Sequence, residues 1–273
     1  MRPFPLKSLL LGAASLGWAL AGSAAAEITA QDKAALIGAV DKGAPRMAQV
    51  AQAIWGYAEV GYQETKSSAL LQSELRKAGF KVEPGVAGMP TAFVASFKTG
   101  EGPVIAILAE FDALPGLAQE ARPVRAPILD QIAGHACGHH LFGAASVAAA
   151  QSLAAWMKAN NVPGEIRVYG TPAEEGGSGK VYMVREGLFA DVDATLHWHP
   201  SDSNNAAQTV FLANISGKFR FAGASAHAAA APFRGRSALD GVEIMNVAMN
   251  YMREHVPDGT RIHYAITDGG DAP

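Results

Sequence analysis

The stretch Pro103-Val104-Ile105-Ala106-Ile107-Leu108-Ala109-Glu110-Phe111-Asp112 is the strongest evidence for the fold class. Its first seven residues are continuously apolar, which is typical of a β-strand buried on both faces of a sheet. Two carboxylates, those of Glu110 and Asp112, follow this predicted strand directly. In open α/β sheets the functional side chains gather at or just beyond strand ends. The stretch therefore predicts a buried strand with polar chemistry at its carboxyl end.

Predicted helices and strands alternate on both sides of this strand. Apolar residues recur at helical spacing over 30–58, 65–79, 141–160 and 181–186. Further strands are predicted over 81–86, 91–97, 165–170 and 193–199. This alternation favours a layered α/β domain with a mainly parallel mixed sheet over residues 27–207. From residue 208 the pattern changes, and strands over 209–221 and 261–267 around a helix over 237–254 predict the beginning of a smaller α+β domain, 208–273.

The first 26 residues have the features of a secretory signal peptide. Arg2 and Lys7 give a positive start, residues 9–21 form an apolar run, and Ala24-Ala25-Ala26 is a small-residue cleavage site. The run is short for a membrane span, although an uncleaved anchor is the alternative. We therefore expect a periplasmic or secreted protein that has no membrane contact after cleavage.

Composition and charge narrow the class of partner. Removing 26 residues from 273 leaves 247, and loss of the two leader cations changes the net charge from −3 to −5. A mildly acidic chain without a basic run argues against nucleic acid and anionic membrane surfaces as partners. The apolar share of 49% is ample for a packed core. These properties fit a globular protein with a packed core.

The single cysteine lies among histidines in His135-Ala136-Cys137-Gly138-His139-His140. In an exported chain a structural cysteine usually has a disulfide partner, and this chain offers none. Thiolate and imidazole are preferred ligands of zinc-like metals, so Cys137 and His139 are predicted ligands. The alternative is a small buried thiol beside a surface histidine.

Two acidic residues stand together in Thr171-Pro172-Ala173-Glu174-Glu175-Gly176-Gly177-Ser178-Gly179, after the predicted strand 165–170. One carboxylate of such a pair can bind a metal while its neighbour acts as general base on a bound water. The alternative is an acidic pair that caps the following helix.

His197-Trp198-His199 and Asp112 complete the candidate set. Strand alternation predicts both histidines on one face, and His199, next to Pro200, lies nearest the sheet edge and is the preferred ligand. A carboxylate such as Asp112 can fix the tautomer of a metal-bound histidine. The alternatives are a buried, hydrogen-bonded imidazole and an ordinary turn aspartate.

Taken together, these motifs resemble the amidohydrolase branch of peptidase family M20. The motifs that carry the resemblance are Asp112-Ala113-Leu114-Pro115, His135-Ala136-Cys137-Gly138-His139, Pro172-Ala173-Glu174-Glu175-Gly176-Gly177 and Trp198-His199-Pro200. The branch includes hydrolases of N-acyl amino acids, auxin conjugates and aminobenzoyl-glutamate, and the Glu-Glu-Gly-Gly-Ser-Gly-Lys stretch is most similar to the B-subunit type of the last. His140 stands where relatives usually have Asp or Asn.

The resemblance implies a role for each matching residue. Cys137, His139, Glu175 and His199 correspond to ligands of a site for two divalent metal ions, with Zn, Mn, Co and Ni all compatible. Glu174 corresponds to the general base and Asp112 to an orienting residue. His227, in Gly223-Ala224-Ser225-Ala226-His227, corresponds to a histidine of the smaller domain that stabilises the substrate oxyanion.

The resemblance also implies the activity and the assembly. We expect a metal-dependent amidohydrolase that cleaves N-acyl or N-aroyl amino acids or small peptides. The smaller domain is expected to be a ferredoxin-like lid that pairs two copies or two related subunits. Family members are longer, so we expect a truncated chain whose remaining ligand is absent. The alternatives are a catalytically inactive metal-binding fragment, a partner-dependent subunit, or a dipeptidase or carboxypeptidase of the same family.

Overall fold

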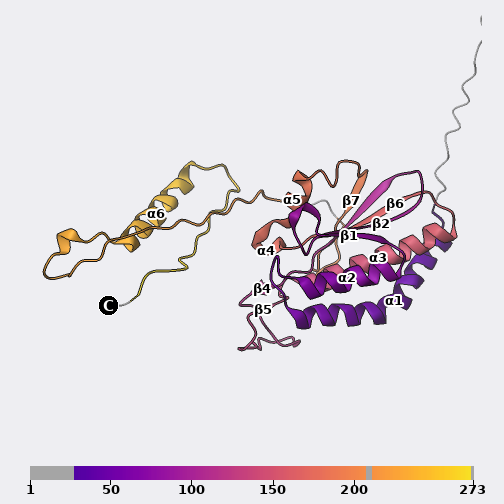
Figure 1. The fold of residues 1–273 in the computed structure, drawn as a ribbon, viewed down its shortest axis with the longest axis horizontal. Coiled ribbons are helices and arrows are strands. Elements are labelled where there is room, and N and C mark those ends of the chain that lie inside the picture. Colours follow the sequence, from indigo (N-terminus) through magenta and orange to yellow (C-terminus); the bar gives the residue numbers. More distant parts are fainter. Residues whose placement is uncertain (1–27, 207–210, 272–273) are drawn as a thin grey trace, which may run out of the picture. The chain divides into compact units, whose positions relative to one another are not determined.

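The computed structural model describes residues 28–206 and 211–271 (Figure 1). The predicted signal peptide, 1–26, lies outside the described residues. The chain divides into two compact units, the first ending at Asn204 and the second beginning at Asn205. Within the described ranges, no helix is both long and apolar enough to cross a membrane.

The first unit is built on a five-stranded sheet with the order β1-β2-β6-β3-β7. The strands are β1 (Lys81–Pro84), β2 (Phe93–Gly100), β3 (Val104–Ala109), β6 (Gly164–Gly170) and β7 (Ala194–Leu196). β3 pairs in parallel with both β6 and β7. β2 runs antiparallel to its two neighbours, β1 and β6. Four strands therefore point the same way, which confirms the predicted mainly parallel mixed sheet.

Two apolar clusters hold the layers of this unit together. α1 (Ala30–Tyr57), α2 (Thr65–Lys77) and α3 (His139–Ala159) pack on one face of the sheet (Figure 1). α5 (Gly179–Arg185) and the short turn η1 (Val86–Gly88) contribute to the cluster on the other face. Ile107 and Ala109 of β3 enter the first cluster, whereas Ala106 and Leu108 enter the second. β3 is thus buried on both faces, as its apolar run predicts.

Three local features differ from the predicted elements. The predicted strand 193–199 ends at Leu196, because only Ala194–Leu196 pair with β3. Two short strands, β4 (Leu114–Pro115) and β5 (Ala133–Gly134), form an antiparallel ribbon after β3. A single turn, α4 (Glu174–Gly177), follows β6. All three lie at the edge where the polar motifs gather.

The second unit has α6 (Ala238–Met252), which confirms the predicted helix, and the short turns η2 (Pro232–Arg234) and η3 (Arg253–His255). The sequence pattern predicts strands over 209–221 and 261–267. The described residues of these two ranges, 211–221 and 261–267, form no strand, so the prediction is wrong for them. A strand requires a neighbouring strand to satisfy its backbone. The pairing described in this unit is a single bridge between Ala224 and Arg236. The ferredoxin-like arrangement is therefore not formed by the described residues.

Replacing Phe93 by alanine tests the packing of the first unit. Its ring is fully buried and stacks 6.1 Å from the ring of Phe111. We expect Phe93→Ala to lower the free energy of unfolding by about 3–5 kcal/mol, since it removes an aromatic side chain from a packed core. Urea unfolding followed by tryptophan fluorescence reports on this unit, which contains Trp55, Trp156 and Trp198.

The matched control for this variant is Ile37→Ala on α1, whose side chain is 63% exposed. The control should change the free energy of unfolding by no more than about 0.5 kcal/mol. Equal effects of the two variants would contradict the described core.

Candidate metal centre

The candidate ligands come from the carboxyl ends of parallel strands and from the start of α3. Glu110 and Asp112 follow β3, Glu174 and Glu175 follow β6, and His199 follows β7. Cys137 precedes α3 by two positions and His139 is its first residue. Because parallel strands end at the same edge of a sheet, the topology brings these segments to one place.

Asp112 connects two of the predicted site residues. Its Oδ1 lies 3.0 Å from Nδ1 of His139, and its Oδ2 accepts a hydrogen bond of 2.8 Å from the backbone N–H of Glu175. Both His139 and Asp112 are buried. With a hydrogen on Nδ1 donated to Asp112, the lone pair of Nε2 is left available to a metal ion. The orienting role of Asp112 has the geometry that it needs.

Cys137, His139 and His199 form a compact group of soft and borderline ligands. Their ligand atoms lie within 4.8 Å of one another, and Sγ of Cys137 is 3.4 Å from Nε2 of His199. Gly138, between the first two, has a φ of 80°, a left-handed conformation that glycine adopts without strain. Sulfur and imidazole nitrogen are the ligand types that zinc prefers.

Glu175 and Glu174 also lie near His139. Oε1 of Glu175 is 4.0 Å from Nε2 of His139. A carboxylate oxygen of the exposed Glu174 lies within 4.8 Å of ligand atoms of His139 and Glu110. The structure thus brings together the predicted ligands Cys137, His139, Glu175 and His199; their binding of metal stays a prediction.

Glu110 is a site residue that the sequence analysis did not assign. Its Oε2 is 3.0 Å from Nε2 of His139, and its Oε1 contacts Nζ of Lys180 and lies 3.7 Å from Nε2 of His197. Its position directly after β3 was a usable signal, because functional side chains gather at the carboxyl ends of such strands. Lys180 was also missed. It ends the Glu-Glu-Gly-Gly-Ser-Gly-Lys stretch, but only the tertiary structure reveals its ionic partner.

The placement of His197 and His199 on one face of a strand stays a prediction. Both residues lie beyond the end of β7, where the pleat no longer governs side-chain direction. His197 lies near Glu110, whereas His199 lies near Cys137. Trp198 between them donates a hydrogen bond of 3.2 Å to Oγ of Ser146 on α3.

Unpartnered atoms show that the residues present fit a cation. Among the described residues, the buried atoms without a hydrogen-bond partner include Oε2 of Glu110, Nε2 of His139 and Oε1 of Glu175. Nε2 of His139 lies 3.0 Å from the first of these oxygens and 4.0 Å from the second. Buried polar atoms are rarely left without a partner. Three convergent ligand atoms of this kind are what a divalent metal ion requires.

The pKa shifts of the site residues also indicate that the site fits a cation. Burial raises the pKa of the Cys137 thiol to about 12, and the carboxylates of Glu175 and Glu174 add to that shift. Burial lowers the pKa of His139, but Asp112 and Glu110 outweigh it and raise the pKa to about 10. Burial likewise raises the pKa of Glu175. A bound cation reverses this logic, because it favours the thiolate and the neutral imidazole.

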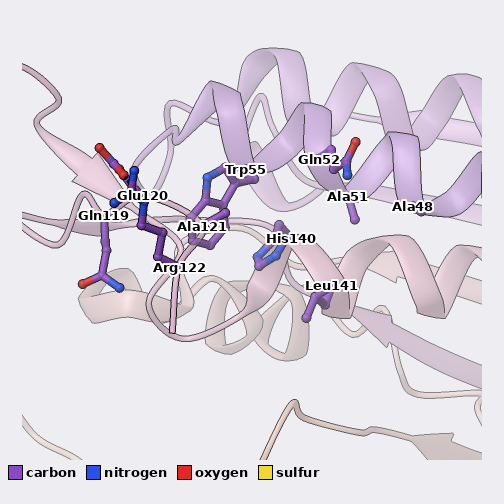
Figure 2. Close-up of a pocket in the computed structure, with 10 residues that line it drawn as sticks. All are labelled: Ala48, Ala51, Gln52, Trp55, Gln119, Glu120, Ala121, Arg122, His140 and Leu141. Atoms are coloured by element: carbon purple, nitrogen blue, oxygen red, sulfur yellow. Dashed lines mark ion pairs between the residues drawn. The ribbon is translucent and has the colours of Figure 1, made fainter. Parts of the chain in front are cut away.

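His227 and His140 occupy different surroundings. His227 is exposed in the second unit, where its Nδ1 accepts hydrogen bonds from the backbone N–H groups of Ala229 and Ala230, at 3.2 and 3.1 Å. Its part in catalysis stays a prediction. His140 packs edge-on against Trp55, with ring centroids 4.9 Å apart, and lines a pocket of about 530 Å³ between α1, residues 119–122 and the start of α3 (Figure 2).

A second pocket reaches the metal centre itself. It has a volume of about 300 Å³, and its lining includes Tyr62, Ala113, Pro115 and Glu175. One of the predicted ligands, Glu175, therefore lies in the wall of this pocket.

Comparison with known proteins assigns the chain to a family. Residues 106–268 match peptidase family M20/M25/M40. The chain belongs to this family. It is 45% identical over 233 residues to the B subunit of p-aminobenzoyl-glutamate hydrolase of Escherichia coli (strain K12), a match that covers 85% of this chain and 48% of that protein. It is 33% identical over 246 residues to Xaa-Arg dipeptidase of Mus musculus, covering 86% and 53%.

The fold agrees with this assignment. The chain superimposes on a crystal structure assigned as an aminohydrolase from methicillin-resistant Staphylococcus aureus with a TM-score of 0.59 and 20% identity, covering 83% of this chain and 59% of that one. The chain spans about half the length of the two relatives above.

Replacing Asp112 by asparagine tests the orientation of His139. The amide keeps the shape of the side chain but retains only one acceptor oxygen for its two donors. We expect Asp112→Asn to weaken Zn²⁺ binding by roughly 10- to 100-fold, the usual effect of losing a partner behind a metal ligand. Titration calorimetry measures the affinity, and Asp130→Asn at an exposed position is the control. Unchanged affinity in Asp112→Asn would remove Asp112 from the site.

Proposed function

We propose that this protein is a metal-dependent amidohydrolase that cleaves the amide bond of an N-acyl or N-aroyl amino acid or of a small peptide. The observation that carries the proposal is the convergence of Cys137, His139 and His199 within 4.8 Å, beside the paired carboxylates of Glu174 and Glu175. Membership of the M20/M25/M40 family supports it, as do the names of the two relatives, a hydrolase and a dipeptidase.

The proposed cofactor is a pair of divalent metal ions held by Cys137, His139, Glu175 and His199. Such ions lower the pKa of a coordinated water and polarise the carbonyl of an amide. The mixed sulfur, nitrogen and oxygen ligands suit Zn, Mn, Co or Ni, and the supply of metal decides among them as much as affinity does.

The protein's own groups would move the proton. Glu174 has an exposed carboxylate beside Glu110 and His139, so it can take a proton from the attacking water and return it to the nitrogen of the leaving amine. Asp112 holds the ring of His139 through Nδ1. His227 of the second unit would donate a hydrogen bond to the developing oxyanion.

Partners and location belong to the same proposal. The E. coli relative is named as one subunit of its enzyme, which supports pairing of this chain with a related subunit or with a second copy. The apolar stretch after Arg2 and Lys7 and the small-residue site at 24–26 support export to the periplasm or secretion.

Replacing Glu174 by glutamine separates metal binding from catalysis. We expect Glu174→Gln to keep its metal content but to lose about 10²- to 10⁴-fold in kcat, since the amide cannot accept the proton. The measurements are elemental analysis and turnover of an N-acyl and N-aroyl amino acid panel. Glu186→Gln, at an exposed position directly after the following helix, is the matched control. Near-native turnover in Glu174→Gln would show that another group is the base.

Removing the metal tests the dependence of the reaction on it. Dialysis against a chelator should abolish turnover, and adding Zn²⁺ or Mn²⁺ should restore it. Nε2 of His139 and Oε1 of Glu175, which have no hydrogen-bond partner among the described residues, would be free to bind the added ion. Cys137→Ser should require more metal for recovery, since it replaces a thiolate by a weaker ligand. Full turnover after complete removal of metal would contradict the proposed function.

A further inference from the structure

Residues 59–64, which we call the clasp, connect α1 and α2 and contact both acidic segments of the metal centre. The backbone O of Glu59 accepts a hydrogen bond of 2.8 Å from the N–H of Ala113, and Val60 pairs with Ala113 in an isolated parallel bridge. Ala113 directly follows Asp112. One end of the clasp is therefore fixed to the segment that orients His139.

The other end of the clasp is Glu64, whose carboxylate is completely buried. Its Oε1 accepts a hydrogen bond of 2.8 Å from the backbone N–H of Ala173, and its Oε2 accepts one of 2.9 Å from Oγ1 of Thr91. Burial raises the pKa of Glu64. The two donors are neutral groups, so they compensate only part of the cost of burying a carboxylate. A buried carboxylate here indicates that Ala173 and Thr91 need a hydrogen-bond acceptor, which an apolar side chain could not provide.

Capping of the adjacent helix does not account for Glu64. It is the residue before α2, but its side chain makes no capping hydrogen bond. The carboxylate of Glu59 serves that purpose, accepting from the N–H groups of Lys66 and Ser67 at 3.0 and 2.9 Å. The side chain of Glu64 is thereby left to reach Ala173, 109 positions away in the sequence.

Ala173 is the residue that needs to be held. Its φ and ψ are 55° and 42°, a left-handed conformation that is strained for a non-glycine residue, and Glu174 and Glu175 follow it directly. Gly61 and Gly177 approach it closely: an added Cβ would lie 2.8 and 2.6 Å from the Cβ of Ala173. Oη of Tyr62 donates a hydrogen bond of 2.6 Å to the O of Gly177. The clasp is therefore hydrogen-bonded to both ends of the turn 173–177, at Ala173 and at Gly177.

We propose that Glu64 is a positioning residue, which holds the Glu174–Glu175 pair at the metal centre by fixing the left-handed turn at Ala173. Any effect of Glu64 on catalysis rests on the proposed function, whereas its effect on the conformation of the turn does not. Asp112 bonds the N–H of Glu175, so the turn is held between two carboxylates, one on each side of Glu174.

Hydrogen–deuterium exchange of the purified protein tests this role without metal or substrate. In Glu64→Ala we expect amide exchange across 171–179 to become at least tenfold faster than in the wild type. Glu64→Gln keeps an acceptor oxygen for Ala173 and should restore most of the protection. The control is Glu59→Ala, which should accelerate exchange only at the start of α2, where its carboxylate bonds residues 66 and 67.

Zn²⁺ titration of the same variants gives the second readout. Glu64→Ala should bind Zn²⁺ roughly 10- to 100-fold more weakly than wild type, with Glu64→Gln intermediate and Glu59→Ala unchanged. If Glu64→Ala does not fold, Thr91→Val removes one donor to the carboxylate and should show smaller changes of the same kind.

Wild-type exchange across 171–179 in both Glu64→Ala and Thr91→Val would overturn the inference. Where the alanine variant does not fold, wild-type exchange in Thr91→Val alone would overturn it. A wild-type protein that binds no Zn²⁺ would instead contradict the proposed function, and the exchange data would still decide the role of Glu64.

Discussion

The carboxylate of Asp112 accepts hydrogen bonds from two segments that are distant in the sequence, the ring of His139 and the backbone of Glu175. The side chain is buried, so its oxygens have no water to replace a lost donor. The start of α3 and the turn after β6 must therefore meet at the end of β3. That requirement couples the orientation of the imidazole to the position of the acidic pair, and neither can shift without leaving a buried charge unsatisfied.

The elements that sequence patterns predict well are those set by local periodicity or by burial on both faces. The apolar run at 104–109 predicts β3, and the three long helices of the first unit follow their apolar spacing. The candidate ligands could also be predicted from the sequence, because parallel strands of an α/β sheet end at one edge and polar motifs follow those strands. Glu175 and His199 come together for that reason, and Cys137 and His139 join them from the start of α3.

What sequence patterns could not predict depends on contacts between distant residues. β7 stops at Leu196 because its ladder with β3 covers only three residues, and no property of 197–199 indicates that limit. In the second unit, residues with strand composition form no ladder in the described part, since pairing requires a neighbour. Glu64 looks in the sequence like an ordinary acidic residue before a helix; only its contact with Ala173 distinguishes it.

The ion pair between Lys180 and Glu110 determines the electrostatic balance of the centre. Five groups around it are anions once the thiol has ionised: those of Glu110, Asp112, Cys137, Glu174 and Glu175. Lys180 compensates part of that charge and leaves the centre negative. A bound cation would offset the remainder, which lowers the cost of enclosing these carboxylates in a medium of low dielectric constant.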